Sequence, residues 1–266
     1  MKHLPPVILL LCLFFAACEP EIIKPEKAGG KIVIAFLHHV DSSPLITDSL
    51  CYVNEAGNVY EVNELKYFIS DVYLIRNGEQ SVHIEDETAI HYTDIDIPAT
   101  LSWKVYDTVP EGTYDSISFI FGLNEVRNVS FAFVNPPEVN MFWPDILGGG
   151  YHYLMLNGKW KNPEGNTTPF DFHLGIGQIY SGTTTSVDSI TGYVQNYFKV
   201  TLPVAGLEIK KNTTRTIGLV MNIESWFCTP HVWDFNVFGG YIMQNQEAMH
   251  RAVENGRDVF EIGSIR

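Results

Sequence analysis

The sequence lacks the short motifs of the common catalytic sites. It contains no Gly-x-Ser-x-Gly, no glycine loop for nucleotide phosphates, no His-Glu-x-x-His and no Cys-x-x-Cys. Asp94 and Asp96 lie two residues apart on one expected strand face. Such a pair is commonly a solvated edge, and nothing else indicates a pair of catalytic carboxylates. We therefore expect a protein that is not an enzyme.

Positive charge is also scarce. The 266 residues include 17 Lys and Arg against 31 Asp and Glu, which gives a formal net charge of −14. A chain of this charge repels nucleic acid and anionic lipid head groups, so we expect no nucleic acid partner. The charge suits a cation or a basic partner, although an acidic surface also serves solubility alone.

Cysteine is the third scarce residue, with four in the chain. Cys12 lies in an expected signal peptide and Cys18 at its end, which leaves Cys51 and Cys228. In an oxidising envelope compartment these two could form a disulfide, and two separate buried thiols are the alternative.

The N-terminus reads as a targeting segment. Lys2 and His3 precede an apolar run over residues 4–17 that is too short to span a bilayer and suits a signal peptide. Two alanines before Cys18 look like a bacterial lipobox, which predicts lipidation at Cys18; ordinary cleavage is the alternative. We expect a signal peptide at 1–17, a polar tether at 18–30, one domain at 31–266, and membrane attachment by the lipid alone.

The rest of the chain is dominated by short extended segments. They recur every 8–12 residues or so with turn signals between them, as in a sandwich or barrel. Residues 63–75 suggest a short helical turn that feeds a strand, and 102–109 with 114–122 suggest a two-strand unit. A helix is expected at 246–255, ended by Gly256 as a positive-φ cap. The prediction is a single all-β, sandwich-like domain with a short C-terminal helix.

The stretch from Met141 to Gly175 is the most promising place for chemistry. His152 and His173 each lie in an aromatic run, and a polar loop joins the two runs, so the runs are expected to pair antiparallel. Two histidines that face each other across paired strands have Cβ atoms about 5 Å apart. Both ring nitrogens can then reach one ion at about 2 Å. The alternative is two core histidines with satisfied hydrogen bonds.

Other side chains could complete such a site. Neutral imidazole suits copper and zinc, and binding is expected to weaken below about pH 6 as free imidazole protonates. Thioether sulfur would favour copper. The additional candidates are His39 as a third nitrogen ligand, Met243, Met249 and His250 as further ligands, and Trp143 and Trp160 as flanking rings.

Several segments, in this order, resemble the MbnP-like copper-binding proteins, in the version found as lipoproteins of Bacteroidetes. The resemblance covers most of the mature chain. The matching segments are Phe36-Leu-His-His-Val40, residues 62–74, residues 110–122, Met141-Phe-Trp-Pro144, residues 148–158, Phe172-His-Leu-Gly175 and residues 255–260.

The resemblance implies a secreted or outer-membrane-attached all-β protein that binds copper through histidines. His152 and His173 match the family's histidine-bearing strands, and His39 matches the first strand. The family also implies a di-haem cytochrome c peroxidase-like partner and, in some relatives, a tryptophan oxidised to kynurenine close to a ligand histidine. This chain departs from that last pattern: it has no Trp-x-His, and Tyr151 and Tyr153 flank His152.

Two rival functions fit the same sequence. An envelope β-sandwich could bind carbohydrate or a partner protein, and another alternative is a redox partner that docks a cytochrome. Sugar-stacking rings would come from Trp103, Trp160, Trp226 and Trp233.

Overall fold

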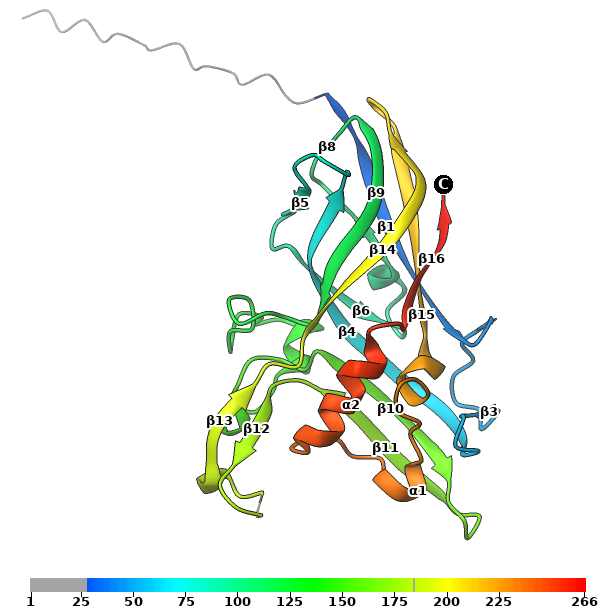
Figure 1. Cartoon of the computed structure of the whole chain (residues 1–266), viewed down its shortest axis with the longest axis vertical. Helices are drawn as coiled ribbons and strands as arrows, with labels where there is room; N and C mark the ends of the chain where they lie inside the picture. The colour runs from blue at the N-terminus through cyan, green and yellow to red at the C-terminus, as the bar shows by residue number, and fades with distance from the viewer. Residues whose placement is uncertain (1–27, 184) are drawn as a thin grey trace, which may run out of the picture.

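The computed structural model describes residues 28–183 and 185–266. The expected signal peptide, the lipidation site Cys18 and most of the tether lie outside these residues. The described chain folds into two sheets that lie face to face, with a small ribbon and a few short helices at one end (Figure 1). Among the described helices, none is long and apolar enough to cross a membrane.

The larger sheet has eight strands and is built on one long strand, β4 (Val59–Ile75). Its main path runs β11-β10-β4-β9-β14, and β3, β5 and β6 also pair with β4. The other strands are β3 (Tyr52–Val53), β5 (Val82–Ile84), β6 (Ile90–Asp94), β9 (Gly112–Phe121), β10 (Leu154–Lys161), β11 (Thr167–Leu174) and β14 (Phe198–Ile209).

The smaller sheet has six strands around β1 (Gly29–Val40), which pairs parallel with β15 (Thr214–Asn222). It also contains β2 (Ser43–Pro44), β7 (Ser102–Lys104), β8 (Val109–Pro110) and β16 (Phe260–Ile265). The ribbon is β12 (Gly177–Tyr180) with β13 (Ile190–Val194), and the α-helices are α1 (Phe235–Phe238) and α2 (Gln246–Gly256). Short 3-10 helices cover 98–101, 138–141, 145–147, 187–189 and 223–227.

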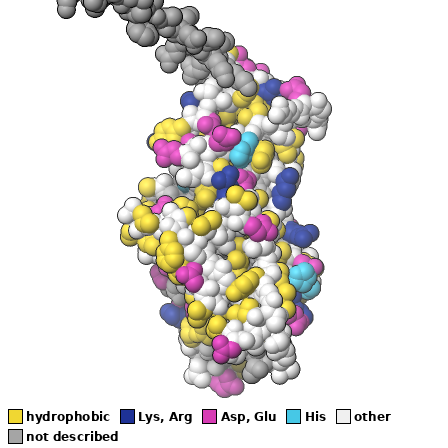
Figure 2. Space-filling view, turned by 90° about the vertical axis from the view of Figure 1, so that its left-hand side faces the viewer, with side chains coloured by type: hydrophobic (Ala, Val, Ile, Leu, Met, Phe, Trp, Pro, Cys, Tyr) yellow, Lys and Arg dark blue, Asp and Glu magenta, His cyan; other side chains and the backbone are white. Residues whose placement is uncertain are grey.

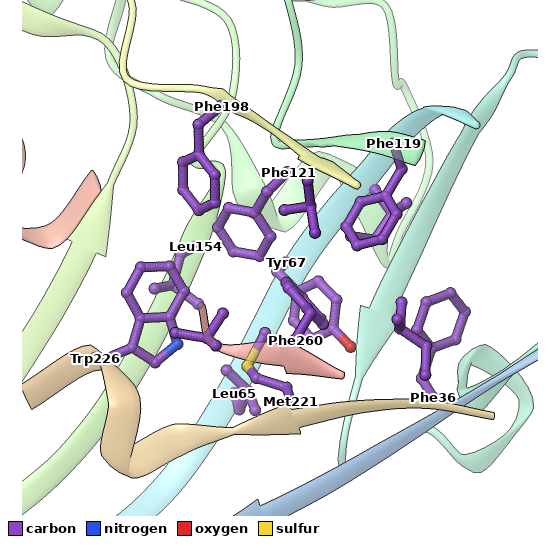
Figure 3. Packing of buried hydrophobic residues seen from close by; sticks show 14 of the residues in the cluster. Phe36, Leu65, Tyr67, Phe119, Phe121, Leu154, Phe198, Met221, Trp226 and Phe260 are labelled. Atoms are coloured by element: carbon purple, nitrogen blue, oxygen red, sulfur yellow. The ribbon is translucent and has the colours of Figure 1, made fainter. Parts of the chain in front are cut away.

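The core lies between the sheets and is rich in aromatic rings (Figure 3). Tyr67 stacks on Phe121 at 5.7 Å between centroids, and Phe121 lies 5.3 Å from Trp226. A smaller cluster around Phe68 and Tyr151 is buried on the opposite face of the larger sheet, because side chains alternate along β4. Acidic side chains are scattered over the face shown in Figure 2 rather than gathered in one patch.

The expected fold class is confirmed: the domain is all-β and sandwich-like, with a short C-terminal helix. The helical turn expected within 63–75 is wrong, because β4 is one strand of 17 residues. Both sheet faces are covered along β4, so its apolar residues do not alternate cleanly and partly mimic a helical stripe. A bulge opposite β9 lies between Ser70 and Tyr73, where Asp71 has φ of 49°.

Other local expectations also change. The strands within 102–109 and 114–122 exist but do not pair with each other: β7 and β8 lie on β1, whereas β9 lies between β4 and β14. Gly256 is the last residue of α2 and has no positive φ; a Cβ there would meet Phe198 and Trp226 at 2.6 Å. Gly29 and Gly30, expected in the tether, already belong to β1.

The two remaining cysteines are free thiols, so the disulfide expected as one alternative is not formed. Cys51 is exposed beside β3, and Cys228 is half-buried after the helix at 223–227. Burial raises the pKa of the Cys228 thiol. The alternative of two separate thiols holds, although Cys51 is exposed rather than buried.

Candidate metal centre

His152 and His173 are in ring contact. Their centroids lie 5.0 Å apart and the planes cross at 88°, edge to face. The expected antiparallel pairing of the two runs is confirmed as β10 with β11. The two histidines are nevertheless not direct cross-strand partners: His173 lies opposite Met155, and His152 lies two residues before β10 begins.

A bridge between Phe142 and Tyr151 explains how His152 is held. The bridge brings the end of the 138–141 helix alongside the entry to β10. The carbonyl of Met141 then accepts the backbone N–H of His152 at 2.6 Å and lies 2.9 Å from its Nδ1. Because a carbonyl only accepts, Nδ1 carries the proton and Nε2 keeps its lone pair.

His173 is held in the complementary way. Its Nε2 lies 2.7 Å from Oδ1 of Asn157, and Nδ2 of Asn157 donates to Glu64 at 2.6 Å. Since the side-chain nitrogen of Asn157 donates to Glu64, the side-chain oxygen of Asn157 faces the imidazole. Nε2 of His173 therefore donates to this oxygen, and Nδ1 keeps the lone pair. Glu64 also pairs with Lys66 on the same strand. A chain of polar contacts across three strands therefore sets the orientation of this imidazole.

Both imidazoles are kept neutral by their surroundings. Burial first, and then the neighbouring His173, lower the pKa of His152 to about 4. Burial lowers the pKa of His173 to about 4 as well. The expectation that protonation begins near pH 6 is therefore wrong for these two rings, because removing them from water penalises the charged form.

This arrangement fits a shared metal ion. Two imidazoles bound to one ion at about 2 Å have ring centroids no more than about 6.4 Å apart, and the observed separation is shorter. Metal-binding histidines usually donate the other ring N–H to a carbonyl or carboxylate. Both rings do so here, so a bound ion would sit on Nε2 of His152 and Nδ1 of His173.

Trp143 lies against His152. Its ring centroid is 4.7 Å from that of His152, and its Nε1 donates to the carbonyl of Leu147 at 3.2 Å. Gly175, at the end of the β11 run, makes room for it: a Cβ there would meet the indole at 2.6 Å. The tryptophan therefore contacts a candidate ligand although the sequence shows no Trp-x-His.

The other expected ligands lie elsewhere. His39 is on β1 of the smaller sheet, paired with Asn222 and Pro44. His250 is exposed on α2, 3.6 Å from Glu254, and Met243 packs on the main core. Within 28–183 and 185–266, no three His, Cys, Asp or Glu side chains gather as an ion site. The structure therefore gives no support to His39 or His250 as third ligand.

Met155 and Asn157 were missed by the sequence reasoning. Met155 lies opposite His173, so the two side chains share one face of the sheet with Cβ atoms about 5 Å apart. Counting residues outward from the turn at 162–166, where Lys161 faces Thr167, pairs position 155 with 173 and 157 with 171. The position of the turn could thus have predicted that the thioether of Met155 and the amide of Asn157 lie beside His173.

The tryptophans proposed to stack on sugars have no open faces. Trp103 and Trp160 are 5% and 6% exposed, and Trp226 and Trp233 are fully buried. A sugar-binding platform made of these rings is therefore wrong.

Comparisons with known proteins agree with this architecture. A family model described as MbnP matches residues 29–250. A solved structure titled MbnP from Methylosinus trichosporium superposes with a TM-score of 0.50 at 14% identity, covering 77% of this chain and 79% of that one. No curated protein matches the chain. The family match covers the larger sheet, the smaller sheet except β16, and the paired histidines, and the chain belongs to the MbnP family.

Proposed function

We propose that this protein binds one copper ion through His152 and His173. The observation that carries the proposal is the ring contact of two neutral imidazoles at 5.0 Å, each with its outer N–H committed to the protein. The lone pairs of the two imidazoles are oriented before an ion binds, so binding requires little further ordering of these side chains.

The donor set favours copper over zinc. Structural zinc sites use four ligands drawn from Cys and His, and catalytic ones use three from His, Glu, Asp and Cys. The described residues supply two histidines here without a third such side chain. The additional donor that lies on the same face is the thioether of Met155, and soft thioether sulfur selects copper(I).

The role we propose is capture, storage or delivery of copper in the cell envelope, without catalysis. The apolar N-terminal run that ends in Ala-Ala-Cys18 supports an outer-membrane lipoprotein that exposes this domain to the periplasm or the medium. The resemblance to copper-binding MbnP-like lipoproteins supports the same role.

The test is an anaerobic titration with copper(I) against a chromogenic chelator. We expect one copper per chain, a loss of about 100-fold or more in affinity for His152→Gln and for His173→Gln, and no change for the exposed control His250→Gln. Asn157→Ala should lower the affinity by about 10- to 100-fold, because it frees the ring of His173. Equal affinity of the wild type and both ligand variants would refute the proposal.

A partner protein is a second proposal, with a di-haem cytochrome c peroxidase-like protein as the expected class. The segment between β9 and β10, which supplies the Met141 carbonyl, exposes several large apolar side chains, and such patches favour protein contacts. They are Val126, Val129, Phe131, Val134 and Ile146. If Phe131→Ser and Val134→Ser bind such a cytochrome as strongly as the wild type does, this surface is not the binding site.

A further inference from the structure

A cavity of about 400 Å³ opens at one edge of the sandwich, away from the histidine pair. Along this edge β1 pairs with β7 at residues 33–35 and with β2 at 39–40, so no described strand lies beside residues 36–38 on that side. The segment that follows β2 and the loop that follows β6 form its walls. The cavity therefore lies between the smaller sheet and the loop of the larger one.

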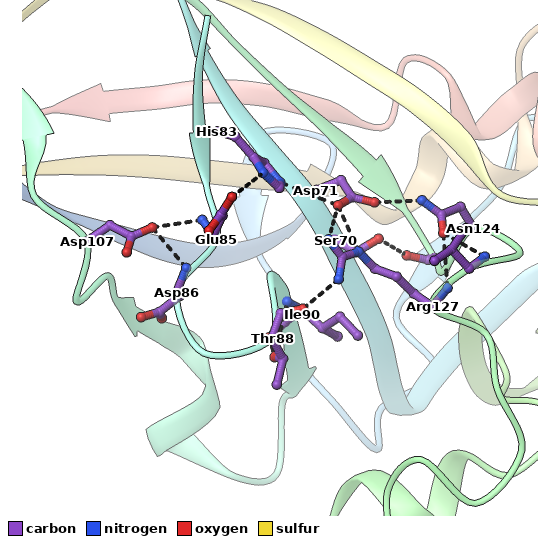
Figure 4. A network of polar contacts seen from close by, with 12 residues as sticks. Ser70, Asp71, His83, Glu85, Asp86, Thr88, Ile90, Asp107, Asn124 and Arg127 are labelled. Atoms are coloured by element: carbon purple, nitrogen blue, oxygen red, sulfur yellow. Dashed lines mark hydrogen bonds and ion pairs between the residues drawn. The ribbon is translucent and has the colours of Figure 1, made fainter.

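Three stacked aromatic rings support one wall of this cavity. Phe36 lines the cavity and lies 4.9 Å from His91, which lies 5.0 Å from Trp103, with an interplanar angle of 9° in both pairs. Nε1 of Trp103 donates to Asp86 at 2.7 Å. Asp107 in turn accepts the backbone N–H of Asp86 at 2.9 Å (Figure 4). Stacking and hydrogen bonds fix this wall, so the cavity is formed before a ligand binds.

His38 is the unusual lining residue. It is 9% exposed, and its Nε2 lies 3.0 Å from the hydroxyl of Tyr67 in the core. Its Nδ1 has no hydrogen-bond partner among the described residues, yet this atom keeps accessible surface and is not one of their fully buried, unpaired polar atoms. Burial lowers the pKa of His38 to about 4, so the ring is neutral. An open nitrogen on an otherwise buried imidazole directs a hydrogen bond into the cavity.

The rest of the cavity offers apolar surface and one carboxylate. Leu45, Ile95 and Leu101 line it and are half-buried. Among the described lining residues, which also include His39, Asp96 is the one acid and none is Lys or Arg. Asp96 is exposed, and its carboxylate forms no ion pair or hydrogen bond with another described residue. The cavity thus presents an imidazole nitrogen, apolar walls, and a free negative charge at its mouth.

We propose that this cavity binds a small aromatic amine with a hydroxyl at its far end. The ligand's hydroxyl forms a hydrogen bond with Nδ1 of His38, and its ammonium pairs with Asp96 at the mouth. The ring lies against the apolar walls, so polar and apolar parts of the ligand match those of the cavity. A metal ion is disfavoured, because no three His, Cys, Asp or Glu side chains of the described residues gather as an ion site. The site does not depend on copper binding.

Tyramine is the probe, measured by ligand-observed NMR titration of the purified, metal-free protein. The titration is run at pH 8, where free imidazole is neutral and a primary amine is charged. Phenethylamine lacks the hydroxyl of tyramine, and 4-ethylphenol lacks its ammonium. We expect saturable binding of tyramine, about fivefold weaker binding of phenethylamine, and about threefold weaker binding of 4-ethylphenol.

Each polar contact has its own variant. Asp96→Asn should bind tyramine and 4-ethylphenol equally, because the charge pair is lost, and should keep the preference for tyramine over phenethylamine. His38→Leu should bind tyramine and phenethylamine equally, because the hydrogen bond is lost. Circular dichroism checks the fold of this variant, since Tyr67 loses a partner. Glu164→Gln, in the exposed turn at 162–166, is the control and should bind as the wild type does.

Three results would overturn the proposal: no saturable binding of tyramine, equal wild-type affinity for tyramine and either truncated compound, or wild-type selectivity in Asp96→Asn. The first two need no variant, so the test holds even if His38→Leu does not fold. Titration of His173→Gln should give the wild-type tyramine affinity, so failure of the copper site and failure of this cavity are distinguishable.

Discussion

This protein should release copper at a much lower pH than a solvent-exposed pair of histidines does. Protonation competes with the metal for each imidazole, and the buried rings of His152 and His173 have pKa values of about 4. For two such rings, lowering the pH from 7 to 5 reduces the apparent affinity only about 1.2-fold. With the ordinary histidine pKa of 6.5, the same step would reduce it about 600-fold.

The assay is copper(I) competition with a chelator calibrated separately at each pH, with far-ultraviolet circular dichroism to confirm the fold. Between pH 5 and pH 3 the loss should reach about 100-fold, since both rings then protonate. At pH 5 the loss of affinity expected for buried rings differs most clearly from the loss expected for ordinary histidines, so the measurement at that pH decides between them. A loss of more than tenfold between pH 7 and pH 5, with the fold intact, would show that these buried rings are not the ligands.

Three further predictions test the fold. Burial lowers the pKa of His38 to about 4, so as the pH falls below 6.5 the unfolded state takes up a proton before the folded state does. The unfolding free energy of the wild type should therefore fall by about 2 kcal/mol more between pH 7 and pH 5 than that of His38→Gln. Urea unfolding at the two pH values measures this difference. Gly175→Ala should cost about 1–3 kcal/mol against the Trp143 ring, whereas Gly192→Ala, with ordinary contact at 3.5 Å, should be tolerated; equal melting temperatures would contradict this. Without reductant, iodoacetamide should alkylate Cys51 faster than Cys228, and a recovered disulfide peptide would be evidence against free thiols.

The sequence by itself determined the strands and the local turns. β-branched and aromatic residues in short runs, broken by Gly, Asn and Pro, are sufficient to mark extended segments, because side-chain alternation and turn conformations are local properties. The pairing of β10 with β11 was predicted in this way. That pairing already linked His152 to His173, because the loop between them is short.

Only the tertiary structure decided what depends on contacts between distant segments. The parallel pairing of β1 with β15 and the separation of β7 from β9 follow from which faces the two sheets bury together, and no local pattern encodes that choice. Burial also lowered the histidine pKa values and enclosed the tryptophans expected to bind sugar. The sequence thus determined which residue types are present, while desolvation and long-range strand register determined their pKa values and their exposure.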